Sequence, residues 1–124
     1  GSSITEGIGQ ARITRNLEGL TVDMSWRIPD AEAIQTVFDL VEEEGLVLGG
    51  STGVNVAGAL RMARELGPDH VVVTILCDSG TRYATRLFNP DYLRAKGLPV
   101  PRWLAGDRPR IPEGTLLDAA GTPP

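Results

Sequence analysis

The sequence predicts an α/β fold with three layers, in which a largely parallel, open sheet lies between helices. Three observations point to it. Segments with β-strand character alternate along the chain with segments of helical period. Short, glycine-rich turns follow the predicted strands, as in connections from parallel strands to helices. The strongest strand candidate, residues 70–76, is rich in β-branched side chains, and residues 46–48 are wholly apolar, which is typical of a strand that is covered on both faces.

The first part of the chain is predicted to hold a loop, a strand and a helix. Residues 1–19 carry early glycines and serines and no sustained period, so we expect a loop with a short helical turn at 10–17. Residues 20–24 alternate apolar and polar side chains, which favours a strand. A helix over 31–43 follows, because apolar residues recur at helical spacing between Asp30, a suitable cap, and Gly45, a suitable stop.

A second predicted strand, residues 46–48, leads into a second helix. The strand is short, wholly apolar and ends at two glycines. The helix that Ser51 introduces is so rich in alanine and leucine that we expect little of it to face water. Gly67 and Pro68 should end this helix.

The third predicted strand, residues 70–76, is rich in β-branched side chains. A turn at 77–80 should lead from it into a helix over about 81–87, and Pro90 should start another short helix that runs to Lys96. Proline and glycine then become frequent, so residues 99–124 are predicted to form an extended tail. Three strands are few for a sheet covered on both faces, and we expect the chain to be part of a longer protein.

Composition and charge argue against several classes of protein. The chain is 41% hydrophobic, which excludes a disordered chain, and no apolar run approaches the roughly 18 residues that cross a bilayer. The formal charge of -4 comes without a basic block, so nucleic acid is not an expected partner. With one cysteine and one histidine we expect no disulfide, no metal site and a reducing, cytoplasmic setting.

Two turns are candidates for binding, because ligands of open α/β sheets lie beyond the carboxyl ends of the strands. They are residues 49–53 (Gly-Gly-Ser-Thr-Gly) and residues 77–80 (Cys-Asp-Ser-Gly). For both turns simple capping of the next helix by a hydroxyl side chain stays open as the alternative. Cys77 is expected to be a small core residue and His70 a surface residue, since neither has an identifiable catalytic partner in sequence.

Four blocks of the sequence together resemble the C-terminal part of the cysteine synthases. The blocks are residues 1–10, 44–55, 73–83 and 98–104, and their order and spacing match over nearly the whole chain. The cysteine synthases are pyridoxal-phosphate enzymes of fold type II, the tryptophan synthase β type. The resemblance implies that residues 1–98 are the C-terminal part of the cofactor-binding domain and that residues 99–124 are its tail.

The resemblance also implies roles for particular residues. In such enzymes the hydroxyl of the Gly-Gly-Ser block bonds the pyridine nitrogen of the cofactor, which implies that role for Ser51, between Gly50 and Thr52. Asp78 and Ser79 match the turn near the pyridine edge. The glycine loop that lines the substrate entrance corresponds to Glu6, Gly7, Ile8 and Gly9.

The reaction implied is replacement of the acetate of O-acetylserine by sulfide, which gives cysteine. It needs a lysine that holds the cofactor, and the only lysine of this chain, Lys96, lies in no motif of that kind. The chain alone is therefore expected to be inactive and to contribute no catalytic residue, whereas the full-length protein is expected to be a homodimer. Two alternatives stay open: a cystathionine β-synthase-like or serine/threonine dehydratase-like enzyme, and a non-catalytic α/β fragment.

Overall fold

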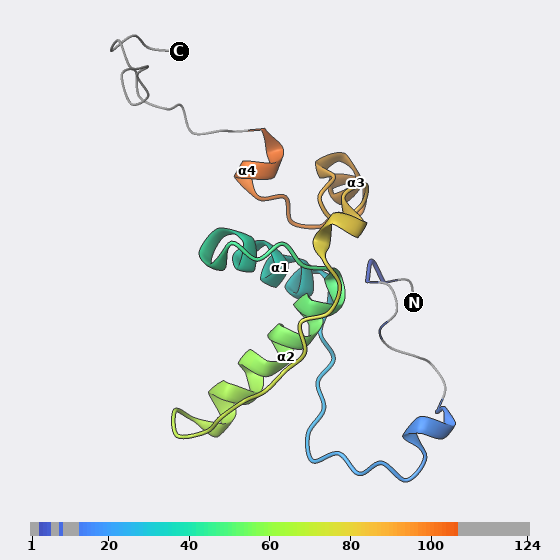
Figure 1. The fold of residues 1–124 in the computed structure, drawn as a ribbon. Coiled ribbons are helices and arrows are strands. Elements are labelled where there is room, and N and C mark those ends of the chain that lie inside the picture. The colour runs from blue at the N-terminus through green and yellow to red at the C-terminus, as the bar shows by residue number, and fades with distance from the viewer. Residues whose placement is uncertain (1–2, 6–7, 9–12, 107–124) are drawn as a thin grey trace.

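The computed structural model describes residues 3–5, 8 and 13–106. Two helices dominate it and short helical turns accompany them (Figure 1). In chain order the elements are η1 (Arg15–Leu17), α1 (Asp30–Glu44), α2 (Gly50–Leu66), η2 (Gly80–Tyr83), α3 (Pro90–Ala95) and α4 (Arg102–Ala105). Within these described ranges, no helix has the length and apolar character needed to cross a membrane.

The predictions for α1, α2 and α3 are confirmed in position, and so are the stops of α1 and α2. Gly45 adopts the left-handed conformation (φ 69°) and its N–H bonds to the carbonyls of Leu40 and Val41, which ends α1. Gly67 ends α2 with φ 88°. The predicted cap of α1 is wrong: Pro29 is the N-cap, and the Asp30 carboxylate bonds to the N-terminal segment instead.

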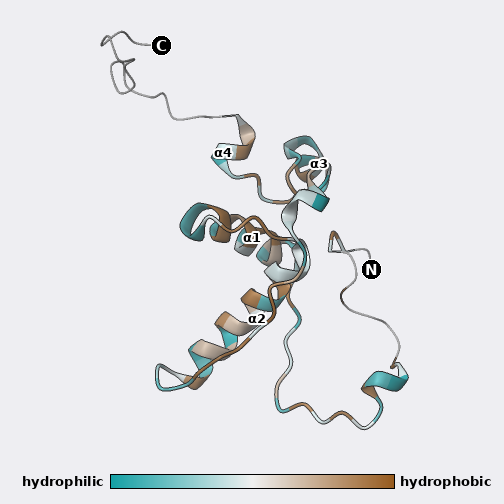
Figure 2. Ribbon diagram, in the orientation of Figure 1, coloured by the Kyte–Doolittle hydropathy of each residue, from teal (hydrophilic) through white to brown (hydrophobic). Residues whose placement is uncertain are grey.

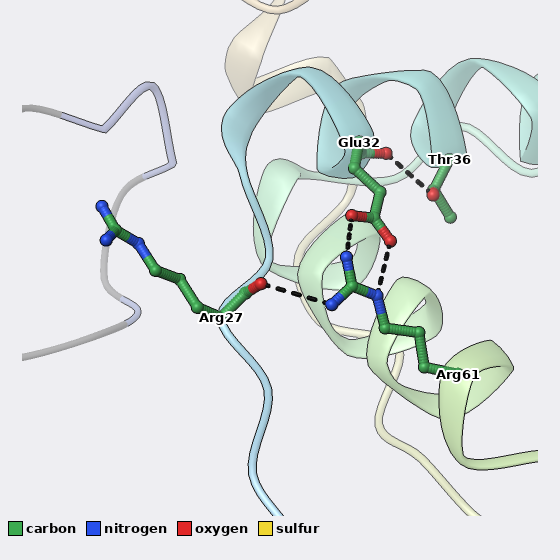
Figure 3. A network of polar contacts seen from close by, with 4 residues as sticks. All are labelled: Arg27, Glu32, Thr36 and Arg61. Atoms are coloured by element: carbon green, nitrogen blue, oxygen red, sulfur yellow. Dashed lines mark hydrogen bonds and ion pairs between the residues drawn. The ribbon is translucent and has the colours of Figure 1, made fainter. Parts of the chain in front are cut away.

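Helices α1 and α2 cross closely where Gly53 of α2 meets α1. A Cβ at Gly53 would lie 2.1 Å from the carbonyl oxygen of Ala33, so only glycine fits there. Further along, Arg61 of α2 forms a two-pronged ion pair with Glu32 of α1 and donates to the carbonyl of Arg27 at 3.5 Å (Figure 3). These contacts fix the two helices and the strand-like segment before α1 to one another.

The core lies between α1 and the segments that follow η2. Phe38 is fully buried and packs edge-on against Phe88 and Trp103, with ring centroids 6.2 and 5.7 Å away. We call the cluster of buried residues around it the Phe38 core. Its members are Ile34, Val37, Phe38, Leu87 and Leu93.

The predicted strands are not found as strands: within the residues described, the only β-type pairing is one antiparallel bridge, between Leu48 and Ser79. Residues 70–76 run along α2 instead (Figure 1), and a helix has no free backbone groups with which to complete a ladder. Their side chains are left in the open, with Val71 92% and Val73 87% exposed. Residues 20–24 are likewise unpaired and exposed.

The last described part differs from prediction in two places. The helix expected over 81–87 is a 3-10 turn, η2, followed by turns to Phe88, because Leu87 and Phe88 both bond back to the carbonyl of Tyr83. The tail expected from residue 99 is not extended at its start. Residues 102–105 form α4, and its Trp103 packs on the Phe38 core. Residues 107–124 of that predicted tail lie outside the described residues.

Candidate functional site

The structure brings the two candidate turns together. The N–H of Gly49 donates to the carbonyl of Asp78 at 2.9 Å, and the N–H of Gly80 donates to the carbonyl of Val47 at 2.9 Å. These bonds flank the bridge between Leu48 and Ser79. The turn before α2 and the turn after residues 70–76 therefore form one joined edge.

The first turn of α2 holds Gly50, Ser51 and Thr52. The prediction that a hydroxyl residue caps the helix at this turn is wrong, because the N-cap residue is Gly49, which has no side chain. Thr52 is fully buried, and its Oγ1 accepts from the N–H of Cys77 at 2.8 Å. Thr52 thus ties the second turn to the helix, while Ser51 is half-buried at the same end of α2.

Close packing surrounds the two glycines before Ser51. A Cβ at Gly49 would lie 2.6 Å from Cε2 of Tyr83, and a Cβ at Gly50 would lie 2.9 Å from Cγ2 of Thr5. Both glycines are buried. The glycine pair therefore lets an aromatic ring from η2 and a side chain from the N-terminal segment reach the start of α2.

In the second turn, Asp78 and Ser79 have different surroundings. Asp78 accepts a hydrogen bond from the Tyr83 hydroxyl at 2.7 Å and lies 3.5 Å from the Arg82 guanidinium. The hydrogen bond to Asp78 raises the pKa of Tyr83. Ser79 caps η2 by accepting from the N–H of Thr81, so the capping alternative is confirmed for this turn. Its hydroxyl also lies 3.0 Å from that of Thr81.

The prediction that Cys77 is a core residue is wrong. Its thiol is exposed and free, so it is not a core residue, although Nδ2 of Asn55 lies 3.5 Å from its sulfur. The same Asn55 amide donates to the carbonyl of Ile75 at 3.0 Å and fastens residues 75–77 to α2. His70 is exposed, as predicted. Among the described residues, no cluster of His, Cys, Asp and Glu could hold a metal ion.

The substrate-entrance loop is described only in part. Ile8 is half-buried, whereas Glu6, Gly7 and Gly9 lie outside the described residues. Thr5, directly before them, contacts Gly50. Lys96 is an exposed residue at the end of α3, with Nζ 5.9 Å from the centre of the Tyr92 ring.

Three residues of the site were missed from the sequence: Thr5, Asn55 and Tyr83. The signal for Asn55 was available, since an amide between the apolar residues Val54 and Val56 of a helix is expected to find a polar partner. Nothing in the local sequence reveals that Thr5 reaches Gly50, because that contact joins segments 45 residues apart in numbering.

Comparison with known proteins decides the family. The family model described as "Pyridoxal-phosphate dependent enzyme" matches residues 2–78, which include both turns up to Asp78. The chain belongs to this family. Its members have an α/β fold and depend on pyridoxal phosphate.

Individual relatives are close over most of the chain. Cysteine synthase 1 of Emericella nidulans and cysteine synthase 1 of Neurospora crassa are each 50% identical over 100 residues, 79% of this chain. Cystathionine beta-synthase of Dictyostelium discoideum is 36% identical over 103 residues, 83% of this chain. The chain spans only 27% of the length of the two cysteine synthases and 21% of the third relative.

Proposed function

We propose that this chain is part of a pyridoxal-phosphate dependent cysteine synthase, which replaces the acetate of O-acetylserine with sulfide to give cysteine and acetate. The family match and the 50% identity to two cysteine synthases support the reaction. The observation that carries the proposal is the joined edge of residues 49–53 and 77–80, which brings the turn that carries Ser51 beside the turn that carries Ser79.

The donor set of this edge suits one part of the cofactor. Ser51 and Ser79 are neutral hydroxyls, and residues 49–53 carry no charged side chain. A neutral hydroxyl can hydrogen-bond a pyridine nitrogen without holding it protonated, as a carboxylate would. The residues present therefore fit the pyridine edge of pyridoxal phosphate, and the proposal gives Gly50 and Thr52 the role of shaping this edge and Asp78 that of bracing it through Tyr83.

When bound, the cofactor supplies the electron sink that allows a group to leave from the β-carbon of the substrate. The chain's own contribution is to hold the ring edge and keep its nitrogen neutral, which suits loss of acetate and addition of sulfide. Lys96 is exposed and stacked on Tyr92, so the proposal assigns it surface charge and takes the cofactor-holding lysine from outside this chain. Residues 6–9 are proposed to line the substrate entrance.

The proposal extends to the sheet and the assembly. Val71, Val73 and Ile75 are 92%, 87% and 72% exposed, and Thr74 and Leu76 are exposed as well. An apolar, β-branched segment that is exposed on both faces is typical of a strand that other parts of an intact protein cover. This supports a three-layer arrangement in which residues 46–48 and 70–76 belong to a largely parallel sheet of the intact protein. We also propose a homodimer and a cytoplasmic setting, the latter supported by the free, exposed Cys77.

The test exchanges the two hydroxyls for carboxylates in the intact polypeptide that carries this sequence. Ser51→Asp and Ser79→Asp are compared with Ser51→Ala and Ser79→Ala, and cysteine formation and cofactor absorbance are recorded. The carboxylate at the ring nitrogen should change the spectrum and lower the rate about tenfold or more, equivalent to about 1.4 kcal/mol. Unchanged spectra and rates in both Asp variants would exclude this edge from the ring nitrogen.

A second candidate function is β-replacement by an amino-acid thiol in place of sulfide. The identity of 36% to a cystathionine beta-synthase favours it. The two candidates share the proposed ring edge and differ in the sulfur substrate. Supplying the intact protein with sulfide and with homocysteine in separate assays decides between them, because only one product should accumulate at a useful rate.

A further inference from the structure

The side chain of Tyr83 touches both turns of the joined edge. It comes from η2, and its ring lies directly over Gly49, where an added Cβ would be 2.6 Å from Cε2 and 3.2 Å from Cδ2 of the ring. Its hydroxyl donates to the carboxylate of Asp78 at 2.7 Å. The N–H of Gly49 and the carbonyl of Asp78 also bond to one another, at 2.9 Å. Tyr83 therefore holds both partners of a backbone bond that joins the turns.

The Phe38 core holds Tyr83 in place. The half-buried side chain of Tyr83 packs against this core. Its carbonyl accepts from the N–H of Arg86 at 3.1 Å and from that of Leu87 at 2.9 Å, so the backbone at the end of η2 is fixed as well. A tyrosine has only two side-chain torsions, so little freedom remains once its ring is packed. The position of the core is thereby passed on to the two turns.

We propose that Tyr83 is a positioning residue for the proposed ring edge, and this inference rests on the proposed function. Gly49 lies two residues before Ser51, and Asp78 lies directly before Ser79. A side chain that holds Gly49 and Asp78 therefore sets the spacing of the two turns that carry the serines. This spacing matters for the reaction, because a hydrogen bond to the cofactor weakens steeply when its partner is displaced or tilted.

The surroundings of Asp78 suit a positioning role better than a role in stability. Its side chain is 46% exposed, so water competes for the hydrogen bond from Tyr83, and loss of this bond should change the free energy of unfolding little. The Arg82 guanidinium lies 3.5 Å from the same carboxylate, but it is 70% exposed and forms a surface ion pair. The packed phenol therefore fixes the direction of this carboxylate more firmly than the guanidinium does.

The experiment compares variants of the intact polypeptide that carries this sequence, loaded with pyridoxal phosphate. Tyr83→Phe removes the hydroxyl and keeps the ring over Gly49, whereas Tyr83→Leu removes both. Tyr92→Phe is the matched control, because it removes the chain's other phenol hydroxyl, which lies on α3 and belongs to neither turn. The kcat and KM for O-acetylserine, the cofactor absorbance, and the hydrogen exchange of the Gly49 and Gly80 amides are measured for each variant.

Tyr83→Phe should lower kcat about fivefold and leave KM within about twofold, because the ring edge is displaced while the substrate still binds. Tyr83→Leu should lower kcat about twentyfold, shift the cofactor absorbance, and speed the exchange of both amides about fivefold or more. Tyr92→Phe should leave all of these within about twofold. Parent exchange of the amides in Tyr83→Leu, or equal kcat losses in Tyr83→Phe and Tyr92→Phe, overturns the proposal.

A double variant tests whether the hydroxyl acts through Asp78. Asp78→Ala removes the acceptor of the same hydrogen bond, so adding Tyr83→Phe to it should lower kcat less than twofold further. A further fivefold loss would mean that the hydroxyl acts elsewhere, and it would overturn the proposal. If Tyr83→Leu does not fold, Tyr83→Phe carries the test, and a parent kcat in that variant overturns the proposal.

The exchange measurement separates this inference from the proposed function. If the parent protein makes no cysteine from O-acetylserine, the proposed function fails, and exchange of the Gly49 and Gly80 amides still shows whether Tyr83 holds the two turns. Faster exchange in Tyr83→Leu than in Tyr92→Phe then supports the positioning role. Equal exchange in these two variants overturns the inference itself.

Discussion

The Phe38 core and the residues 70–76 are built from equally apolar sequence, yet they end in opposite environments. Ile34, Val37 and Phe38 are completely buried, whereas Val71, Val73 and Ile75 are at least 72% exposed. Figure 2 shows the difference as apolar colour along the thin segment beside α2. The core is closed by side chains from α1, α3, α4 and the turns between them, whereas a strand needs backbone partners from other strands. The helical segments of the Phe38 core therefore bury their apolar side chains within the described residues, whereas residues 70–76 do not.

The largest change in stability is expected for a substitution at the crossing of α1 and α2, among the helices that bury their own apolar side chains. Gly53→Ala would place a methyl group 2.1 Å from the Ala33 carbonyl oxygen, so the helices must separate. We expect a loss of about 3 kcal/mol or more in the free energy of unfolding. Gly58 of the same helix has open space around it, and Gly58→Ala should stabilise by about 0.5–1 kcal/mol. Denaturant unfolding of both variants checks this, and equal changes would argue against a tight crossing.

A smaller change in stability is expected for a substitution in the exposed residues 70–76. It tests whether these residues are paired in a sheet in the intact polypeptide. Val73→Lys should destabilise that protein by about 2 kcal/mol, because a charge would enter a paired, covered strand. His70→Lys, at the exposed first position of the same segment, should change stability by less than about 0.5 kcal/mol. If thermal unfolding shows Val73→Lys to be as mild as the control, the face stays in water and the sheet proposal is wrong.

The smallest change in stability is expected from the hydrogen bond that Tyr83 donates to Asp78. This bond links the Phe38 core to the candidate site. Because this bond raises the pKa of Tyr83, the folded protein keeps the phenol proton at a higher pH than the unfolded chain does. The stabilisation is complete below the ordinary phenol pKa of about 10 and is lost as the pH rises through the folded value. Ultraviolet titration, taken as the difference from Tyr83→Phe, should show this pKa falling in Asp78→Asn. If Asp78→Asn leaves the titration of Tyr83 unchanged, the hydrogen bond to Asp78 does not raise the pKa of Tyr83.

Much of the helical fold could be predicted because its signals are local. The stops at Gly45 and Gly67 depend on backbone freedom that only glycine has, and the helical spacing before them is visible in the sequence. The cap at Asp30 could not be predicted correctly, because its carboxylate prefers the N–H of Ile4 and the Ser3 hydroxyl, 26 and 27 residues away. Cys77 was misplaced for a related reason: a core assignment required a covered strand, and that covering depends on partners beyond residues 70–76.

The two turns of the candidate site were predicted from the sequence, but the backbone hydrogen bonds that join them were not. Ser51 and Ser79 were each placed at a turn, and the structure adds that backbone bonds at Gly49 and Gly80 fuse the two turns. Such bonds involve atoms that every residue carries, so the sequence has no mark for them. The resemblance implies the ring-nitrogen role for Ser51 alone, and the joined edge adds that the turn carrying Ser79 lies beside the start of α2.

The most direct test of the proposed ring edge is ¹⁵N NMR of the pyridine nitrogen in the intact protein loaded with ¹⁵N-labelled pyridoxal phosphate. A neutral hydroxyl should leave this nitrogen unprotonated in the parent protein, and one of Ser51→Asp or Ser79→Asp should move its resonance to the protonated position. A protonated nitrogen in the parent, or an unchanged resonance in both variants, would contradict the account.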